Sequence, residues 1–337
     1  MTFGMRRVAI ACAALVAVLV SSFATAGEFE WNLETYPVPT KNALPSRIAI
    51  DRNCVIWVLE ANANKIGKFD LGKKAFIEYE IPTSRSFPSD ITSDNAGVVW
   101  FVEQDANQLG RFDPVTNTFK EFEIPTMDGV PRRVGSDDNG IIWFTEFFGN
   151  NLGKFDPRTE SFTEYPIPTP NSQPTGLVVD PEGVIWFLQS QGNKLASFDP
   201  LSEKFKEFDF PEPFLVPKDI VIDHNGLIWF GGRRNSKLMM FNPSTERFLG
   251  FALPVKGVVE GLAVDQPGNI LFSLGNVGKL GAMNSVSREF LEFKAVLGQS
   301  EPNDIAVDCN GNIWFTDISQ NTLNKLRGED LLGLWLK

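Results

Sequence analysis

One short pattern, Asp-x-x-Gly-x-Ile-Trp, returns with variations every 42 or 43 residues along most of this 337-residue chain. Its seven copies begin at Asp51, Asp94, Asp137, Asp180, Asp223, Asp265 and Asp308. A repeat of about 40–45 residues is the length of one four-stranded blade of a β-propeller, in which each blade buries the apolar faces of its neighbours. The sequence therefore predicts an all-β fold with the architecture of a seven-bladed β-propeller.

Each unit contains four short stretches with the alternation of apolar and polar residues that is typical of strands. An inner strand, such as residues 177–179, runs into the turn, where Asp caps the backbone and Gly supplies a positive φ. A second strand follows at residues 185–187, and the third corresponds to residues 64–69 in the first unit. The fourth strand has the pattern Phe-x-Glu-aromatic, as at residues 119–122.

The two ends of the chain predict how the ring closes. The seventh unit stops after its third strand near Leu326, whereas an unpaired fourth strand, residues 33–39, precedes the first unit. Pairing these two segments would complete the last blade and leave only short, protected strand edges. We therefore expect residues 27–337 to form a single propeller domain that is stable as a monomer.

The first residues have the features of a secretory signal. Arg6 and Arg7 precede an apolar run at residues 8–20, and Ala24-Thr25-Ala26 offers small residues for cleavage. We interpret residues 1–26 as a signal peptide, which predicts a periplasmic or secreted protein with no stable membrane insertion after cleavage. A retained membrane anchor is the alternative, although the apolar run is short for spanning a bilayer.

The charge of the chain limits its partners. Of its 31 basic residues, two lie in the leader, so the mature chain would carry 29 basic against 42 acidic residues, a formal charge of −13. Such a surface repels nucleic acid and anionic membranes. We expect no nucleic-acid partner, and instead a small molecule or a peptide bound at the mouth of the central channel.

Two cysteines remain outside the leader, Cys54 and Cys309, and both occupy the Asp-x-x-Gly turn, in the first and the seventh unit. These units are neighbours in a closed ring. In an oxidising compartment a disulfide between them would secure the closure, provided that the two turns approach closely enough for disulfide geometry. Two free thiols are the alternative.

Most of the conspicuous residues have structural explanations. The Trp row repeats with the blade period, as at Trp57 and Trp100, which indicates packing between blades, and seven equivalent Asp residues indicate turn caps. The only histidine, His224, occupies a variable position of one turn. A single histidine excludes a His dyad, a His-based metal cage and a Ser-His-Asp triad within one chain.

Functional residues are expected where the repeats differ, in the loops that lead from the fourth strand of one blade to the inner strand of the next. Two positions in each unit are expected to ring the mouth of the channel. The first follows the residue that opens the inner strand: Ser46, Ser89, Arg132, Thr175, Lys218, Glu260 and Asn303. The second lies three residues after the Trp position: Glu60, Glu103, Glu146, Gln189, Gly232, Leu274 and Asp317.

The charges near this mouth are unevenly distributed. Glu60, Glu260, Glu301, Asn303, Asp304 and Asp317 belong to blades six, seven and one, whereas Arg132, Arg133, Lys218, Arg233 and Arg234 belong to blades three and five. Carboxylates with an amide suit a hard cation, Mg²⁺ or Ca²⁺, for which Glu301, Asn303 and Asp317 are the predicted ligands. Arg132 and Lys218, with Glu60, Glu103 and Glu146, are the predicted ligand-binding residues. Solvated loop charges that neutralise each other are the alternative.

Several segments resemble the streptogramin (virginiamycin B) lyase family across essentially the whole mature chain. They include Ile142 to Glu146 (IWFTE), Asn64 to Phe69 (NKIGKF) and Glu164 to Pro170 (EYPIPTP). The resemblance implies a seven-bladed propeller. It also implies elimination at an ester of cyclic depsipeptide antibiotics, with Mg²⁺ and a few His and Glu residues at the channel mouth.

The chain departs from this family at the residues that would carry the chemistry. In the family the last blade opens with Glu-Pro-His, and here the stretch is Glu301-Pro302-Asn303. The blade before it opens with Pro-His, where this chain has Glu260. Because Asn cannot act as a general base, elimination would require Glu260 or Glu301 to abstract the proton. Glu301, Glu260 and Asn303 are therefore the candidate catalytic residues, and true streptogramin lyase activity is not expected.

A local similarity to the gluconolactonase and regucalcin-like (SMP-30) propellers involves Pro302-Asn303-Asp304 and the segment Gly311 to Asp317. In that family Asn and acidic residues surround a divalent metal that polarises a lactone, which implies lactone or ester hydrolysis. The sequence thus leaves two functions open. One is a secreted propeller that binds a small ligand or a partner at the channel mouth, and the other is a divergent metal-dependent lyase, lactonase or esterase.

Overall fold

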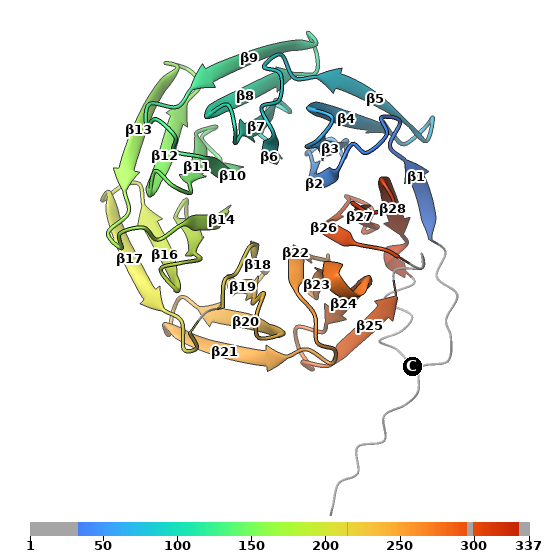
Figure 1. Cartoon of the computed structure of the whole chain (residues 1–337). Coiled ribbons are helices and arrows are strands. Elements are labelled where there is room, and N and C mark those ends of the chain that lie inside the picture. Colours follow the sequence, from blue (N-terminus) through green and yellow to red (C-terminus); the bar gives the residue numbers. More distant parts are fainter. Residues whose placement is uncertain (1–32, 214, 295–298, 330–337) are drawn as a thin grey trace, which may run out of the picture. The chain divides into compact units, whose positions relative to one another are not determined.

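A computed structural model describes residues 33–213, 215–294 and 299–329, and these form seven four-stranded antiparallel sheets around a central channel (Figure 1). The predicted all-β, seven-bladed propeller is confirmed. The predicted signal peptide, residues 1–26, lies outside the described residues. Within the described part of the chain, no helix has the length and apolar character needed to cross a membrane.

The strands follow the order inner to outer within each blade. Blades one to three contain β2 (Pro45–Ile50), β3 (Ile56–Glu60), β4 (Lys65–Asp70), β5 (Ala75–Glu80), β6 (Pro88–Ser93), β7 (Val99–Glu103), β8 (Gln108–Asp113), β9 (Thr118–Glu123), β10 (Pro131–Ser136), β11 (Ile142–Glu146), β12 (Asn151–Asp156) and β13 (Ser161–Pro166). Blades four and five contain β14 (Pro174–Val179), β15 (Ile185–Gln189), β16 (Lys194–Asp199), β17 (Lys204–Asp209), β18 (Ile220–Ile222), β19 (Ile228–Gly231), β20 (Lys237–Asn242) and β21 (Arg247–Ala252). Blades six and seven contain β22 (Val259–Val264), β23 (Ile270–Leu274), the 3₁₀ helix η1 (Gly275–Val277), β24 (Lys279–Met283), β25 (Phe290–Lys294), β26 (Pro302–Val307), β27 (Ile313–Asp317) and β28 (Thr322–Leu326).

The ring closes through the first strand of the chain. β1 (Glu34–Pro37) pairs antiparallel with β28 and completes the seventh sheet (Figure 1). The ring of Tyr36 on β1 stacks on Trp314 with centroids 5.9 Å apart. The predicted closure by an N-terminal strand is therefore present, and it joins the first and the last segments of the fold.

The Asp-x-x-Gly turn is held by one carboxylate. In blade three, Asp137 Oδ1 accepts hydrogen bonds from the backbone N–H groups of Asn139 and Ile141, each at 2.9 Å. Its Oδ2 accepts the indole N–H of Trp143 at 3.2 Å, and Gly140 adopts φ +76°. The carboxylate thus connects turn and core, which explains why Asp, Gly and Trp recur together.

Blade six shows the same requirement by a different route. Leu271 replaces the Trp there, so no indole reaches Asp265. Asn269 Nδ2 donates to Asp265 Oδ2 at 2.8 Å instead. The turn carboxylate therefore retains a side-chain donor although its usual partner is missing.

The core lies between blades rather than within them. Trp143 of blade three is almost fully buried and packs with Phe187 and Phe198 of blade four, and the other interfaces repeat this pattern. Complete burial of such side chains contributes about 2–3 kcal/mol each from the hydrophobic effect. The repeat period therefore sets the spacing of the core.

Cys54 and Cys309 form a disulfide in this structure, with Cα atoms 5.8 Å apart and a sequence separation of 255. Cys54 occupies the place of the turn glycine and adopts φ +61°. The bond joins the turns of blades one and seven, the same two blades that β1 and β28 connect.

Candidate functional site: the channel mouth and its buried floor

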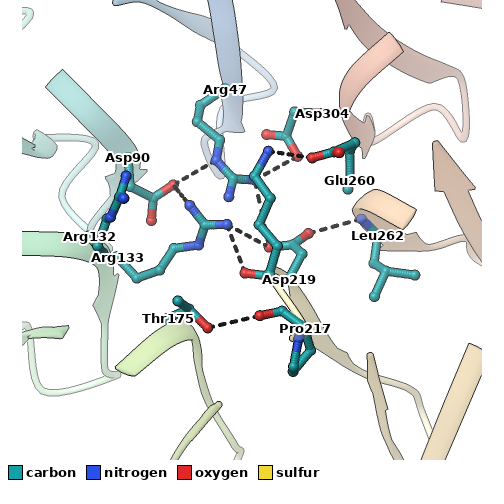
Figure 2. A network of polar contacts seen from close by, with 12 residues as sticks. Arg47, Asp90, Arg132, Arg133, Thr175, Pro217, Asp219, Glu260, Leu262 and Asp304 are labelled. Atoms are coloured by element: carbon teal, nitrogen blue, oxygen red, sulfur yellow. Dashed lines mark hydrogen bonds and ion pairs between the residues drawn. The ribbon is translucent and has the colours of Figure 1, made fainter. Parts of the chain in front are cut away.

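Charged side chains from several inner strands converge on one another in a network of ion pairs (Figure 2). They come from the third residue of the inner-strand segments: Arg47, Asp90, Arg133, Asp219 and Asp304. We call these five residues the channel plug. The register of the inner strand shifts between its first and third residues in several blades, for example between Pro131 and Arg133. Such a bulge re-aims the side chains that follow it.

Two guanidinium groups hold the plug together. Arg47 lies 3.0 Å from Asp304, 3.4 Å from Asp90 and 3.6 Å from Asp219, measured between nitrogen and carboxylate oxygen. Arg133 approaches Asp219 at 3.5 Å and Asp90 at 3.8 Å. Since both arginine side chains are more than 90 % buried, these ion pairs are shielded from solvent.

The second oxygen of each plug carboxylate fastens the adjacent blade. Asp90 accepts a hydrogen bond from the Val134 N–H at 2.9 Å. Asp219 accepts one from the Leu262 N–H at the same distance (Figure 2). Asp304 likewise accepts the N–H of Ile48 at 2.9 Å, across the ring closure. Each carboxylate therefore links one blade to the next and to the central arginines.

Glycine occupies the plug position in the two remaining blades, as Gly176 and Gly261. A Cβ on Gly261 would lie 2.8 Å from Asp304 Oδ1 and from the Asn303 carbonyl oxygen. A side chain at this position would therefore collide with the plug. Glycine permits the close approach of the inner strands that keeps the plug compact.

The plug carboxylates have altered acidity. Burial raises the pKa of Asp90 to about 7, although Arg47 and the Val134 N–H oppose the shift. Burial also raises the pKa of Asp304, again against Arg47. Burial lowers the pKa of Arg47, but the net shift is upward because Asp304, Asp219 and Asp90 stabilise its charge. The arginines therefore oppose the effect of burial on these carboxylates without cancelling it.

Above the plug, Lys218 is the centre of a polar cluster at the mouth. Its amine donates to Glu260 at 2.8 Å and to the Asn303 side-chain oxygen at 3.1 Å. Arg233 binds the other oxygen of Glu260 at 3.2 Å, and Asn303 Nδ2 donates to the Ser46 carbonyl at 2.5 Å. The structure therefore brings together the predicted Lys218, Glu260 and Asn303, from blades five, six and seven.

The Lys218 amine is partly accessible, because 29 % of its side-chain surface is exposed. Burial by the surrounding protein lowers the pKa of Lys218, and the Arg47 charge below it acts in the same direction, whereas Glu260 opposes them. Both oxygens of Glu260 are engaged by cations, one by Lys218 and the other by Arg233.

Arg132 forms the other side of the mouth, on blade three. It donates to the Gln104 side-chain oxygen at 2.7 Å, and its guanidinium lies 4.8 Å from the centroid of the Phe147 ring. Phe148 packs against Phe147 and is 65 % exposed. A cation held on an aromatic surface beside an exposed ring suits a ligand that has both carbonyl and apolar groups.

The predicted metal ligands are engaged in other contacts. Asp317 accepts hydrogen bonds from Ser300 Oγ at 2.5 Å and from the Glu301 N–H at 3.1 Å, while the Glu301 side chain is exposed. The side-chain oxygen of Asn303 faces the Lys218 amine. No group of three or more His, Cys, Asp and Glu residues suited to a metal ion occurs in the described part of the chain. As arranged, these residues do not fit a divalent cation.

Glu60, Glu103 and Glu146 do not line the rim of the mouth. All three side chains are fully buried and face the outer strands of their own blades. A strand residue three positions after the Trp points to the opposite face of the sheet from the Trp. The spacing in the sequence does not show how far such a residue lies from the channel.

His224 lies on the far face of the propeller, because the inner strands run from the mouth to the Asp turns. Its Nε2 lies 3.0 Å from the Asp265 carbonyl oxygen. It borders a cavity of about 760 Å³ whose apolar wall includes Val178, Val221 and Val264. The only histidine therefore takes no part in the channel mouth.

Sequence reasoning missed the channel plug. The signal was present, because the residue after each predicted mouth position reads Arg, Asp, Arg, Gly, Asp, Gly and Asp around the ring. Two basic and three acidic residues at one structural position can neutralise each other only if they converge. The bulge that turns them inward has no mark in the sequence.

Seven blades around a polar channel mouth, floored by buried ion pairs, define a β-propeller with its candidate site where the inner strands begin. The model of the virginiamycin B lyase family matches residues 20–198 and 158–332. This chain belongs to that family.

Solved structures agree with this assignment. The virginiamycin B lyase of Staphylococcus aureus is 25 % identical, with a TM-score of 0.83 over 88 % of this chain and 99 % of that chain. The same values hold for a catalytically inactive histidine-to-alanine variant of that enzyme with quinupristin. The extracellular domain of a one-component system protein of B. thetaiotaomicron shares the fold, with 14 % identity and a TM-score of 0.70 over 88 % of this chain and 39 % of that chain. No curated protein matches the chain.

Proposed function

We propose that this family member is an extracytoplasmic binding protein whose channel mouth holds a small ligand rich in ester, amide or carboxylate oxygens, such as a cyclic depsipeptide. The observation that carries the proposal is the Lys218 cluster. A partly exposed amine lies between Glu260 and Asn303, the two positions at which the family resemblance implies histidines. The cluster retains hydrogen-bond donors for a ligand but has lost the histidine bases.

The second side of the mouth supports the same ligand chemistry. Arg132 supplies a further cation, and Phe148 supplies an exposed ring. A depsipeptide ring presents carbonyl oxygens and apolar side chains together, so it could contact both features. Membership of the family, whose relative has been solved with quinupristin, makes this ligand class the first to test.

Elimination at an ester is the second candidate, and the lowered pKa of Lys218 favours it over hydrolysis by a metal-bound water. In its neutral form the amine could take a proton from the carbon next to the ester-bearing carbon. A C=C bond would form between these two carbons as the C–O bond breaks, and the carboxylate would leave with the electron pair of that bond. No step here passes through Mg²⁺ or Ca²⁺. The lactonase and esterase alternatives of the sequence rest on metal ligands that do not converge in this arrangement.

The experiment is calorimetric titration with virginiamycin B, with and without Mg²⁺ or Ca²⁺, followed by mass spectrometry of the mixture. The variants are Lys218→Met and Arg132→Met, and the control is Lys120→Met on the outer strand β9. Binding without a linear product, lost in both mouth variants but not in the control, supports the binding function. A linear product that disappears in Lys218→Met supports elimination. No binding of virginiamycin B, of a panel of aldonolactones or of aryl esters overturns the proposal.

The extracytoplasmic location is part of the same proposal. The leader-like residues 1–26 and the Cys54–Cys309 disulfide support it, because disulfides persist in oxidising compartments. Cell fractionation with detection of the mature N-terminus near Gly27 tests it. A protein found only in the reducing compartment with its leader intact contradicts it.

A further inference from the structure

Three buried glutamates of blades one to three lack the partners that an ionised carboxylate requires. Glu60, Glu103 and Glu146 end the second strand of their blades and have no exposed surface. Both carboxyl oxygens of Glu60 and Glu103, and one of Glu146, have no hydrogen-bond partner among the described residues. Burying a charge without donors costs several kcal/mol, so three such charges require an explanation.

Each of these glutamates faces a second carboxyl group on the outer strand, from Glu78, Glu121 or Glu164. The outer carboxylate is held on both oxygens by one threonine of the preceding loop. In blade three, the Thr126 N–H and hydroxyl donate to the two oxygens of Glu164, each at 2.9 Å. Thr83 binds Glu121 in the same way at 2.9 Å for each bond. The threonine thus supplies one donor to each oxygen of the outer carboxylate.

Blade four shows what the inner position must supply. Gln189 replaces the glutamate there, and its Nε2 donates to Glu207 at 2.8 Å. Glu207 is also held by Thr169, through the N–H at 3.1 Å and the hydroxyl at 2.8 Å. The inner side chain is therefore a donor to the threonine-bound glutamate. A carboxyl group can play this part only while it carries a proton.

We propose that Glu60, Glu103 and Glu146 are buried proton-binding sites, each a neutral carboxylic acid that donates its proton to the threonine-bound glutamate of the same blade. Ionisation breaks the O–H bond and releases the proton to solvent, and it leaves two adjacent carboxylates without a donor between them. Gln189 is the permanent donor at the equivalent position of blade four.

The groups that face each site differ among the blades. Burial and Glu78 raise the pKa of Glu60 to about 8, and Lys65, whose amine is 2.9 Å from Glu78, opposes them. Burial and Glu121 raise the pKa of Glu103 to about 7. The neighbouring Ser86 hydroxyl acts in the opposite direction, although it donates to Asn64 Oδ1 at 2.9 Å in this structure.

The third site is similar. Burial and Glu164 raise the pKa of Glu146 to about 8, although Asn151 donates to it at 3.1 Å and Thr126 also lowers it. No basic group is among the causes of the Glu146 shift, whereas Lys65 contributes in blade one. Glu146 is therefore the site to mutate first.

These sites lie directly beneath the loops of the mouth face. A Cβ on Gly149 would lie 2.4 Å from Glu146 Oε2, so the turn that follows Phe147 and Phe148 packs on the carboxyl group. Loss of the proton would push the Glu146 and Glu164 carboxylates apart and loosen both that turn and the loop of Thr126. The mouth-side loops of blades one to three are thereby made sensitive to pH, and that of blade four is not.

The sign follows from the direction of the shifts. The folded protein holds these protons up to higher pH than the unfolded chain, whose glutamates have a pKa near 4.5. Proton binding therefore stabilises the fold most fully at acidic pH, and the stabilisation is lost as pH rises from about 5 to 8. Unfolding near pH 6 should release about one proton from each of these three glutamates.

The experiment uses the full-length protein with Glu60→Gln, Glu103→Gln and Glu146→Gln singly and together, and Gln189→Glu as the matched reverse change. Infrared spectra at pH 6 should show protonated carboxyl bands that each Gln substitution removes. The triple variant should release about three fewer protons on unfolding and lose most of the fall in denaturation midpoint between pH 5 and 8. Gln189→Glu should add a fourth site and steepen that fall.

Three outcomes overturn the proposal. The first is the absence of protonated carboxyl bands in the wild-type protein at pH 6, a measurement that does not depend on any variant folding. The second is stoichiometric binding of Na⁺ or Ca²⁺ that is abolished by Glu103→Gln, which would replace the proton by a cation. Equal destabilisation of the Gln variants at pH 5 and pH 8 also contradicts proton binding, because a neutral amide should be tolerated best at high pH.

Discussion

The two ends of strand β11 carry two buried carboxyl groups in opposite situations. Asp137, before the strand begins, accepts two backbone N–H groups and an indole N–H. Glu146, at its end, faces another carboxylate and receives one side-chain amide. The comparison teaches that two buried acids beside one strand can differ completely in the hydrogen-bond donors that they receive.

The same contrast separates the two faces of the propeller. On the turn face, the aspartates have essentially the same donors in every blade, and even the exceptional blade six supplies Asn269 in place of a tryptophan. On the mouth face, the residue at the end of the second strand changes from Glu in blade three to Gln in blade four and to Gly232 beyond β19 in blade five. Uniformity marks the face that specifies the fold, and variation marks the face that can acquire a ligand.

The largest loss of stability is expected when a buried carboxylate that has donors is deprived of one. Arg47→Ala removes the nearest guanidinium of Asp304 and of Asp90 and one of the two beside Asp219, so the free energy of unfolding should fall by about 3–5 kcal/mol. Urea denaturation at pH 7 measures it. Arg52→Ala, which removes an exposed ion pair with Asp138, is the control and should cost little. A loss below about 1 kcal/mol would show that the plug carboxylates do not need their arginine.

A change of pH tests the protonation of Glu60, Glu103 and Glu146 without any substitution. Between pH 5 and pH 8 the wild-type free energy of unfolding should fall by about 1.4 kcal/mol per pH unit for each glutamate that is protonated only in the folded state, because raised pKa values make the folded state the better proton binder. Asp90 and Asp304, whose pKa values are also raised by burial, contribute with the same sign. Denaturation of the triple Glu→Gln variant over the same range isolates the glutamates, and a stability that rises with pH would contradict the assignment.

A matched pair of amide substitutions should separate the two ends of β11. Asp137→Asn replaces an acceptor of the indole N–H by an amide that cannot satisfy all three donors, so stability should fall by about 1–2 kcal/mol at pH 8. Glu146→Gln at the same pH should leave stability unchanged or raise it, since the amide reproduces the donor of Gln189. Thermal and chemical denaturation compare the two. An equal loss of unfolding free energy in both variants would contradict the proposed difference between Asp137 and Glu146.

The smallest effect is expected at the outer strands. Lys120 and Glu160 form an ion pair at 2.5 Å, but both side chains are about half exposed. Lys120→Ala should change the free energy of unfolding by less than about 0.5 kcal/mol, because solvent screens the pair. Urea denaturation at low and high salt measures the change. A loss above about 1 kcal/mol would mean that the short Lys120–Glu160 contact stabilises the fold despite its exposure to solvent.

The sequence contained most of the fold because the blade is a local unit. The turn pattern with its Asp, Gly and Trp fixed the number of blades, and the unpaired segment at residues 33–39 predicted the closure through β1. The mouth residues Lys218, Glu260 and Asn303 followed from one aligned column. These features depend on neighbours within a blade or at an equivalent position.

The parts that could not be predicted depend on which way a side chain turns. The column beside the mouth residues held Arg47 and its partners, but only the bulge directs them to the axis. The Phe-x-Glu-aromatic pattern contained Glu164, yet nothing in the spacing showed that it meets Glu146 across two strands. Periodicity specifies position along a strand, whereas proximity across the sheet requires the register.

The ring is sealed twice at one seam, by the hydrogen bonds of β1 with β28 and by the Cys54–Cys309 bond. The segment between the two cysteines is thus a covalent circle through five whole blades. A protease that nicks any loop of blades two to six would open this circle without releasing a fragment, and new termini placed in such a loop would still leave every blade connected. The chain and the disulfide therefore form a covalently closed ring, and a single backbone cut within blades two to six leaves all parts covalently connected.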